Sequence, residues 1–162
     1  MIRTIAIAVA GFLLLGGATL DRSSEREKSA SNVALGRRVF SEVYGEGKVA
    51  LVDQLYADDF VDDSPGGGKG RELIKEAVTG FHQAFPDLHI EIEDAFSAGD
   101  KVVIRYVAQG TQTGSFNGIP STGKSGKVRG ITIFLIENGK IKIEWTEYDR
   151  LGLLRQLGVI PG

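Results

Sequence analysis

The last predicted strand of the chain carries two carboxylates at its end. The segment from residue 141 to residue 149 reads IKIEWTEYD. Because side chains alternate between the two faces of a strand, one face begins with apolar residues and ends with Glu147 and Asp149. A carboxyl group walled by apolar groups has a raised pKa, which suits it to acid or base catalysis near neutral pH. The spacing predicts that Glu147 and Asp149 are catalytic. The alternative is that they mark the solvated end of the strand or pair with an arginine.

The strand before it predicts a wall for this site. Asn138-Gly139 is a strong signal for a two-residue hairpin loop. With such a loop, Phe134, Thr132 and Gly130 share the face of Glu147, and Gly130 lies opposite it. A missing side chain beside a carboxylate is typical of a pocket, and we assign Phe134 and Thr132 to substrate binding there. A longer loop with a bulge would reverse the facing of one strand.

Four more aromatic side chains are candidates for lining the pocket. Trp145 shares the face of Glu147 on the last strand. Phe81 and Phe85 lie on the apolar face of a predicted helix, and Phe116 lies in a loop where it would cap the pocket. Their orientations decide the volume of the pocket, which spacing alone does not determine. The pattern predicts a site for a small hydrophobic molecule.

Three polar residues are further candidates for substrate binding, each with a plainer alternative. His82 lies at the edge of the apolar helix face, where it either lines the pocket or lies at the surface. Arg105 shares a strand face with apolar residues, and a buried arginine needs a carboxylate partner such as Glu147 or Asp149. Asp63 belongs to an acidic segment, and it either points into the pocket or is solvated in a loop.

The segment from Gly118 to Ser125, GIPSTGKS, fits the phosphate-binding pattern G-x-x-x-x-G-K-[ST]. That pattern binds phosphate only where a strand leads into it and a helix begins at its lysine. The residues after Ser125 instead alternate as a strand and run into the hairpin. We therefore predict a loop between two strands, able to serve as a lid, and no nucleotide site.

The composition excludes several other classes of protein. The chain has 162 residues, one domain's worth, and its formal net charge of −2 gives no footprint for nucleic acid. It has no Cys and two His, which excludes a thiolate metal site and a cysteine nucleophile. The acidic segment 58–63 lacks the distal Glu of a calcium loop. We predict no metal and no cofactor.

The first twenty residues predict export. A short positive start precedes the apolar run 5–17, which is shorter than the roughly 20 residues of a membrane-spanning helix. We expect residues 1–20 to be a signal peptide and the protein to be periplasmic or secreted. The cleavage site is poor, so an uncleaved membrane anchor is the alternative. Residues 21–32 are polar and predict a flexible linker, and residues 33–160 are the expected domain.

The hydrophobic period of the domain changes at Pro86. Before it, helical spacing predicts three helices, over residues 33–44, 49–56 and 71–85, with a short strand near residue 58. After it, alternation predicts four strands, over residues 88–96, 101–109, 127–136 and 140–149. Residues 151–157 predict a last helical turn. Helices followed by an antiparallel meander indicate an α+β fold.

Several of these segments together resemble the SnoaL-like polyketide cyclase family of the nuclear-transport-factor-2-like superfamily. They are GSFNGIPSTGK, the ENGKI hairpin, WTEYDRLGLLRQLG and the strand pair FPDLHIEIEDAFSAGDKVVIRY. The resemblance covers about residues 33–158. It implies a curved antiparallel sheet of about four main strands plus a short edge strand, packed with three N-terminal helices into a cone-shaped barrel with an internal pocket. It also implies ring closure by aldol condensation without metal or cofactor, with Asp149 matching the acid/base aspartate.

Some positions depart from the chemistry of this family and its relatives. Glu147 matches an acidic residue of epoxide-hydrolase-like relatives, but Arg105 lacks the acid of their R-x-D pair. Asp63 stands where the family often has a His and matches the base aspartate of ketosteroid isomerase. The oxyanion-hole tyrosine of that isomerase falls at Phe40, which has no hydroxyl to donate.

The resulting functional prediction is a cofactor-free cyclase or isomerase acting on a hydrophobic carbonyl compound. A non-catalytic module that binds an apolar ligand, or a dimerisation domain of the same fold, is the alternative. Under the hairpin register above, Ile131, Ile133 and Leu135 lie on the sheet face away from the pocket. An apolar outer face predicts a homodimer formed through the sheet.

Overall fold

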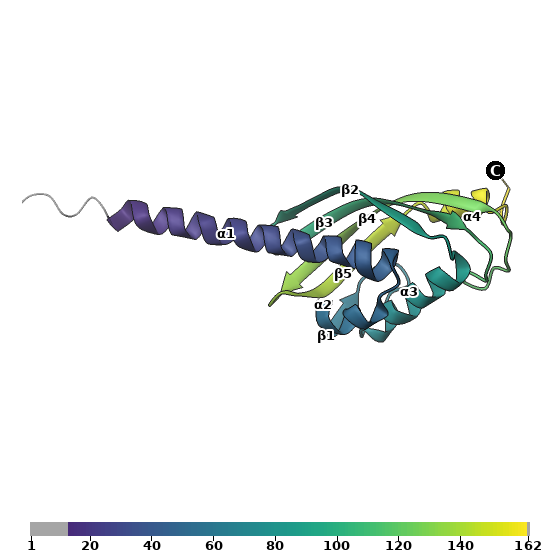
Figure 1. Ribbon diagram of the computed structural model, residues 1–162, viewed down its shortest axis with the longest axis horizontal. Helices are drawn as coiled ribbons and strands as arrows, with labels where there is room; N and C mark the ends of the chain where they lie inside the picture. Colours follow the sequence, from purple (N-terminus) through teal and green to yellow (C-terminus); the bar gives the residue numbers. More distant parts are fainter. Residues whose placement is uncertain (1–12, 162) are drawn as a thin grey trace, which may run out of the picture.

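Helices come first along the chain and strands follow, as the change of period at Pro86 predicts. The computed structural model describes residues 13–161. The elements in this range are α1 (Leu13–Arg38), η1 (Val39–Gly45), η2 (Val49–Leu51), α2 (Val52–Leu55), β1 (Tyr56–Asp62), α3 (Glu72–Ala84), β2 (His89–Ala98), β3 (Lys101–Thr111), β4 (Ser125–Glu137), β5 (Lys140–Tyr148) and α4 (Arg150–Gln156). The predicted α+β class is confirmed (Figure 1).

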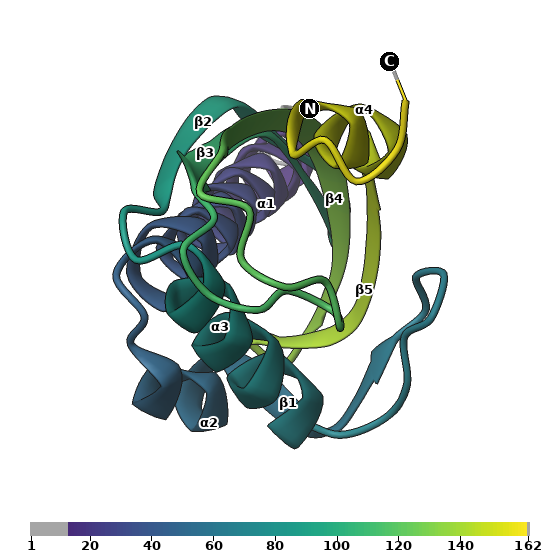
Figure 2. The same ribbon diagram turned by 90° about the vertical axis from the view of Figure 1, so that its right-hand side faces the viewer.

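The five strands form one sheet with the order β1-β5-β4-β3-β2. Strands β2 to β5 are the predicted antiparallel meander. β1 is the predicted short edge strand, but it pairs in parallel with β5, so the sheet is mixed. The sheet curves around the helices without closing, which gives the expected cone-shaped enclosure an open side (Figure 2).

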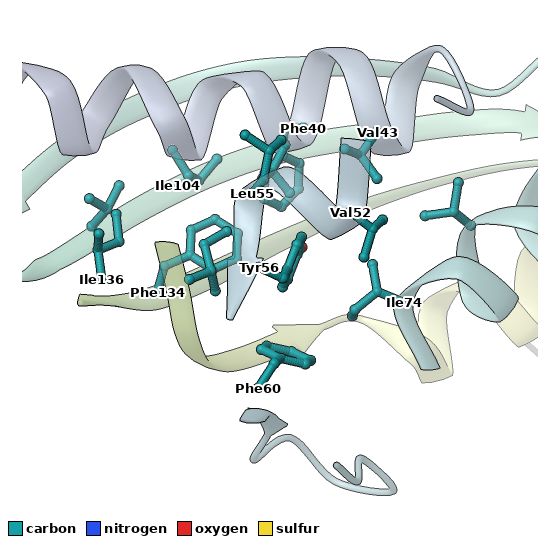
Figure 3. Packing of buried hydrophobic residues seen from close by; sticks show 14 of the residues in the cluster. Phe40, Val43, Val52, Leu55, Tyr56, Phe60, Ile74, Ile104, Phe134 and Ile136 are labelled. Carbon is teal, nitrogen blue, oxygen red and sulfur yellow. The ribbon is translucent and has the colours of Figure 1, made fainter. Parts of the chain in front are cut away.

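Two helical segments fill the concave side of the sheet. In α3, Ile74 and Val78 are buried on one face, and the helix ends just before Phe85-Pro86 as predicted. The end of α1 crosses β3 closely, since a Cβ atom at Gly36 would lie 3.0 Å from Val102 Cγ1. η1 then contributes Phe40 to the central core, whose members Figure 3 shows meeting from both layers.

The segment 21–32 is helical, and the prediction of a flexible linker there is wrong. It forms the middle of α1, which extends beyond the sheet as a single long helix (Figure 1). Five of its polar residues are Glu, Arg or Lys, which are strong helix formers although they are as polar as linker residues. Ion pairing supports its packed end, where Lys28 Nζ lies 2.6 Å from Asp100 Oδ1.

The predicted signal peptide or anchor, residues 1–20, lies mostly outside the described residues and stays a prediction. Within residues 13–161, no helix is long and apolar enough to cross a membrane.

The outer face of the sheet carries the apolar residues that the hairpin register predicts. Ile131 is 46% exposed, and Phe96 on β2 is 55% exposed. Phe96, Val103, Ile133 and Trp145 follow one another across four neighbouring strands as register partners. That a second copy of the chain covers this face stays a prediction.

Candidate active site

A cavity of about 280 Å³ lies between the concave face of the sheet and the helices. Its wall is mainly aromatic and aliphatic, with residues from α3, η1, the inner strands, the loop after β3 and α4. The apolar lining residues include Phe40, Phe81, Phe85, Leu88, Ile90, Phe116, Val128 and Leu153. The loop after β3 and α4 lie at the end of the domain that faces the viewer in Figure 2. The predicted apolar pocket is therefore present in the structure.

One carboxyl group lines this cavity from the middle of β5. Glu144 is only 4% exposed. The Thr146 hydroxyl donates to its Oε1 at 3.0 Å, and the Tyr56 hydroxyl donates to its Oε2 at 3.3 Å. Thr146 in turn lies 2.7 Å from the hydroxyl of Thr132 on β4. A buried carboxyl group with its own set of hydroxyl partners is thus built into the wall of an apolar cavity.

The surroundings raise the pKa of Glu144 to about 7. Burial is the largest cause because it destabilises the charged form, and the negative charge of Asp62 acts in the same direction. The hydroxyls of Thr146, Tyr56 and Tyr44 lower the pKa and offset part of this rise. Glu144 therefore exchanges a proton near neutral pH, which is the property required of a general acid or base.

All four tyrosines of the chain gather around Glu144 and the cavity. Tyr44, Tyr106 and Tyr148 line the cavity, and Tyr56 binds Glu144 directly. Burial raises the pKa of Tyr44, Tyr56 and Tyr106 above the ordinary value for tyrosine. These phenols are neutral at physiological pH and are available as hydrogen-bond donors.

Gly130 makes room for one of these rings rather than for a carboxylate. A Cβ atom at Gly130 would lie 2.5 Å from Tyr106 Cζ and from its hydroxyl oxygen. The ring of Tyr106 also packs on Phe40 with 4.6 Å between centroids. The missing side chain at Gly130 does mark the pocket wall, as the sequence predicts, but the group that uses the space is a tyrosine.

A β-bulge reverses the predicted facing of β5. The two-residue hairpin loop is confirmed: Glu137 pairs with Lys140, and Asn138 and Gly139 both have positive φ. Ile136 then pairs with Ile141, but Leu135 pairs with Ile143, so Lys142 is an extra residue on β5. Beyond Lys142 every side chain changes face.

This reversal moves the predicted catalytic residue Glu147 away from the cavity. Glu147 pairs with Ile131 on the outer face and is exposed. Glu144, Thr146 and Tyr148, which the uninterrupted alternation places outside, face the cavity instead. The prediction that Glu147 faces the pocket is therefore wrong, and the inward carboxylate of β5 is Glu144.

Asp149 also lies outside the cavity, at the N-terminus of α4. Its Oδ1 accepts a hydrogen bond from the backbone N–H of Gly152 at 2.8 Å, which makes it the N-cap of this helix. The side chain is exposed. The carboxylate that the resemblance matches to an acid/base aspartate is thus engaged in capping.

Two substitutions of Asp149 test its role as the N-cap of α4. We expect Asp149→Ala to lower the free energy of unfolding by about 1 kcal/mol, since an N-cap is lost. Asp149→Ser keeps a capping oxygen and is expected to stay within about 0.5 kcal/mol of the parent protein. Urea unfolding measures both variants. Equal destabilisation by Ala and Ser would contradict the capping role.

Four of the predicted substrate-binding residues do line the cavity. They are Phe81 and Phe85 at the end of α3, Phe116 in the loop after β3, and Thr132 on β4. Phe116 packs against both phenylalanines, with ring centroids 5.8 Å from Phe81 and 5.3 Å from Phe85. The helical spacing of the first two and the strand facing of Thr132 were sufficient to place them.

Trp145 and Asp63 meet each other on the outer side of the sheet. Trp145 Nε1 donates to Asp63 Oδ2 at 2.8 Å, and Lys101 Nζ lies 5.2 Å from the centre of the indole. The bulge at Lys142 explains the position of Trp145. Asp63 follows the end of β1, and its neighbour Asp62 is the one that lines the cavity. Neither Trp145 nor Asp63 lines the cavity, so neither is placed to contact a substrate there as predicted.

Arg105 lies on the outer face as well, and its partners are on β2. Its Nε donates to Asp94 Oδ2 at 2.8 Å, and a second nitrogen pairs with Glu93. The predicted carboxylate partner of Arg105 is present, but it is neither Glu147 nor Asp149. The arginine ties two strands together rather than contributing to the cavity.

Phe134 and His82 complete the predicted set, and both have structural positions. Phe134 is fully buried in the central core, where Figure 3 shows it near Tyr56. It therefore packs behind the cavity instead of lining it. His82 Nε2 lies 2.8 Å from the carbonyl oxygen of Tyr44, and the side chain is half-buried. This bond connects α3 to η1.

The segment Gly118–Ser125 is a loop followed by a strand, as predicted. β4 begins at Ser125, so no helix starts at the Lys124 position as a phosphate-binding loop requires. The buried amide of Gln112 shapes the loop instead, donating to the carbonyls of Gly114, Ile119 and Pro120. Among the described residues, no group of three or more His, Cys, Asp or Glu is placed to hold a metal ion.

Sequence reasoning missed the inner residues of the site, above all Glu144, Asp62 and Tyr106. For Glu144 the sequence does contain a weak signal. Glu144, Thr146 and Tyr148 form a polar stripe on one face of a strand whose other face also carries charge. Two faces of equal polarity leave the facing undecided.

Comparison with known proteins agrees with this architecture. The model of the SnoaL-like polyketide cyclase family matches residues 34–157. TsrD from Streptomyces laurentii is 34% identical, with a TM-score of 0.74 over 81% of this chain and 97% of that one. A proposed polyketide cyclase from Bacillus cereus is 32% identical, with a TM-score of 0.69 over 80% and 82% of the two chains. IdmH from Streptomyces antibioticus, another proposed polyketide cyclase, is 27% identical, with a TM-score of 0.68 over 78% and 98%. No curated protein sequence matches the chain.

Proposed function

Because the chain belongs to the SnoaL-like polyketide cyclase family, we propose that it is a small-molecule enzyme whose acid/base group is Glu144. Its substrate is a hydrophobic carbonyl compound, and the reaction is a cyclisation or isomerisation that needs no cofactor. One observation carries this proposal. A carboxyl group that is 4% exposed lines an apolar cavity and has a pKa raised to about 7.

The chemistry follows from the position of this carboxylate. Ionised Glu144 removes a proton from the carbon next to a carbonyl group, and the substrate becomes an enolate. In a cyclisation the enolate carbon attacks a second carbonyl of the same molecule, forming a carbon–carbon bond and an alkoxide. Protonated Glu144 returns its proton to that alkoxide and regenerates the carboxylate. In an isomerisation the proton returns to a different carbon.

The tyrosine hydroxyls are suited to stabilise the negative charge that develops on oxygen. Tyr106 and Tyr148 line the same cavity as Glu144. Preorganised donors in a site with little water are effective in this role because their dipoles need no reorganisation. Phe40 stands where ketosteroid isomerase has its oxyanion-hole tyrosine and has no hydroxyl. Tyr106 on β3 or Tyr148 on β5 is available to donate in its place.

A direct measurement of Glu144 tests the first step of this proposal. In protein with carbon-13 in its Glu carboxyl groups, we expect one resonance to titrate near pH 7, because burial and Asp62 both oppose ionisation. Glu144→Gln should remove that resonance alone. A spectrum in which no Glu titrates above about pH 5.5 would exclude Glu144 as a tuned base.

Turnover is tested with a generic ketone in D2O. A base of this kind exchanges the protons next to the carbonyl of 2-tetralone for deuterium, which proton NMR follows as a loss of signal. The rate should rise with pH and level off above about 7, because only ionised Glu144 accepts a proton.

The alternative, a non-catalytic module that binds an apolar ligand, is favoured by one observation. The aspartate matched to the family's acid/base residue, Asp149, caps α4 and does not line the cavity. If 2-tetralone binds in the cavity and no exchange above the buffer rate occurs, this alternative replaces the enzyme.

A further inference from the structure

Two acidic side chains from neighbouring strands line the cavity. Asp62 of β1 and Glu144 of β5 are direct register partners in the parallel strand pair, and both line the cavity. Within residues 13–161, no Lys, Arg or His lines it. In the same part of the chain, neither Asp62 nor Glu144 has an ion-pair partner, whereas the neighbouring Asp58 and Asp59 pair with Arg71 and Lys142.

Two like charges directly opposite each other on neighbouring strands destabilise a sheet. Here the repulsion appears as the effect of Asp62 on the ionisation of Glu144. The Oδ1 atom of Asp62 accepts from the backbone N–H of Ser64 at 3.0 Å, which holds the carboxylate at the end of β1. The fold therefore maintains a pair of acidic groups whose natural complement is a positive charge in the cavity.

The rest of the lining suits a positive charge as well. Seven aromatic rings line the cavity, among them Phe40, Tyr44, Phe81 and Tyr106. The face of an aromatic ring carries partial negative charge and attracts an ammonium group, more strongly where water is excluded. An anion in the same place would meet two carboxylates and no Lys, Arg or His of residues 13–161.

We propose that the compound bound in this cavity carries a protonated amine, whose ammonium group lies beside the carboxylates of Glu144 and Asp62. This inference rests on the proposed function, since it takes the cavity as the substrate site. It adds the charge of the substrate: an apolar body with an amine is preferred to its neutral analogue, and a carboxylate of the same shape is rejected.

If the ligand is an amine, its affinity should depend on pH through the ionisation of Glu144. The hydroxyls facing Glu144 come from η1, β1 and β3 (Tyr44, Tyr56 and Tyr106), and burial raises the pKa of each, so they remain neutral. Asp62 is the other charged group beside it. As pH rises through about 7, Glu144 gains its charge and the affinity for an ammonium group increases.

Three naphthalene probes of similar shape test the charge preference. They are 2-naphthylmethylamine, 2-naphthalenemethanol and 2-naphthoate, titrated by calorimetry into the full chain at pH 6 and pH 8. At pH 8 the amine should bind at least about tenfold more tightly than the alcohol, and the carboxylate most weakly. Between pH 8 and pH 6 the amine should lose up to about tenfold in affinity, while the alcohol should not.

Variants assign the effect to the two carboxylates. Glu144→Gln should remove both the pH dependence and most of the amine preference. Asp62→Asn should weaken amine binding and keep a pH dependence, but shift it to lower pH, because the charge of Asp62 no longer raises the pKa of Glu144. It provides a second measurement if Glu144→Gln folds poorly. Glu147→Gln, on the outer face, is the matched control and should bind like the parent protein.

The outcomes separate this inference from the proposed function. If the alcohol binds as tightly as the amine, the amine preference is overturned, and ketone exchange that depends on Glu144 would still support the enzyme. If none of the three probes binds, the cavity is not a ligand site and both proposals fail.

Discussion

Glu144→Gln should slow deuterium exchange of 2-tetralone by about 10²–10⁴-fold, down to the rate of the buffer. The amide keeps the shape of the side chain and its place in the cavity wall, but it does not accept a proton from carbon. Glu144 is the one cavity carboxylate with a pKa raised to about 7. The two hydroxyl groups that hydrogen-bond to Glu144, those of Tyr56 and Thr146, are donors in the structure and do not replace a base.

A second glutamate on β5, Glu147, provides a matched control for Glu144→Gln. Glu147 lies three residues further along the same strand and differs from Glu144 mainly in facing outward. Glu147→Gln should leave the exchange rate within about twofold, a change typical of an exposed site outside the active centre. Equal rates for Glu144→Gln and the parent protein, with the fold intact by circular dichroism, would remove Glu144 from the mechanism.

Glu144→Gln should also change how stability depends on pH: the variant loses activity but becomes more stable than the parent protein at high pH. The pKa of Glu144 is about 7 in the folded state and near 4.5 in an unfolded chain, so the folded protein binds more protons between these values. Stability is therefore lost as pH rises from about 4.5 through 7. Relative to the parent protein, Glu144→Gln should gain about 3 kcal/mol across this window. A variant that loses exchange yet gains relative stability at pH 8 has not simply unfolded.

Most of the fold could be predicted because its signals are local. The alternation after Pro86, the Asn138-Gly139 turn and the helical stripe ending at Phe85 each depend on a few neighbouring residues, and the structure contains all of them. The helix over residues 21–32 was missed because helix-forming charged residues and linker residues have similar polarity. What distinguishes them is packing against distant strands: Ser29 meets Ser97 on β2, and the following residues of the helix pack on β3 at Gly36.

The site could be predicted only in part because its geometry depends on one extra residue. A strand has period 2, so the bulge at Lys142 turns every later side chain to the other face. Nothing in IKIEW marks Lys142 as the inserted position. The bulge does not affect the residues of α3 and β4. Phe81, Phe85 and Thr132 therefore line the cavity as predicted. Asp62 was missed for another reason: its neighbour Asp63 is equally acidic, and only the pairing of β1 with β5 decides which one faces inward.

Phe134→Ala should lower the free energy of unfolding by about 3–5 kcal/mol, the largest stability effect expected in this protein. Phe134 is fully buried and packs on Phe40 with 6.1 Å between ring centroids. Truncation removes the whole ring from a core that Figure 3 shows filled from both layers. Urea unfolding measures the loss, and Phe96→Ala is the control, since that ring is 55% exposed on the outer face. It should cost about 0.5 kcal/mol or less.

Phe134→Ala should also lower the pKa of Glu144, because Phe134 and Glu144 are direct partners across β4 and β5. The space left by the ring lies beside the carboxyl group of Glu144, which already binds the hydroxyls of Tyr56 and Thr146, so water there would have polar partners. Water beside the carboxylate stabilises the charged form and removes part of the burial that raises the pKa. The carboxyl resonance of Glu144 reports this shift at a pH and temperature where the variant is still folded. A large loss of stability with an unchanged Glu144 titration would mean that the ring supports the core alone, and that Asp62 and the cavity wall are sufficient to hold the base near neutral pH.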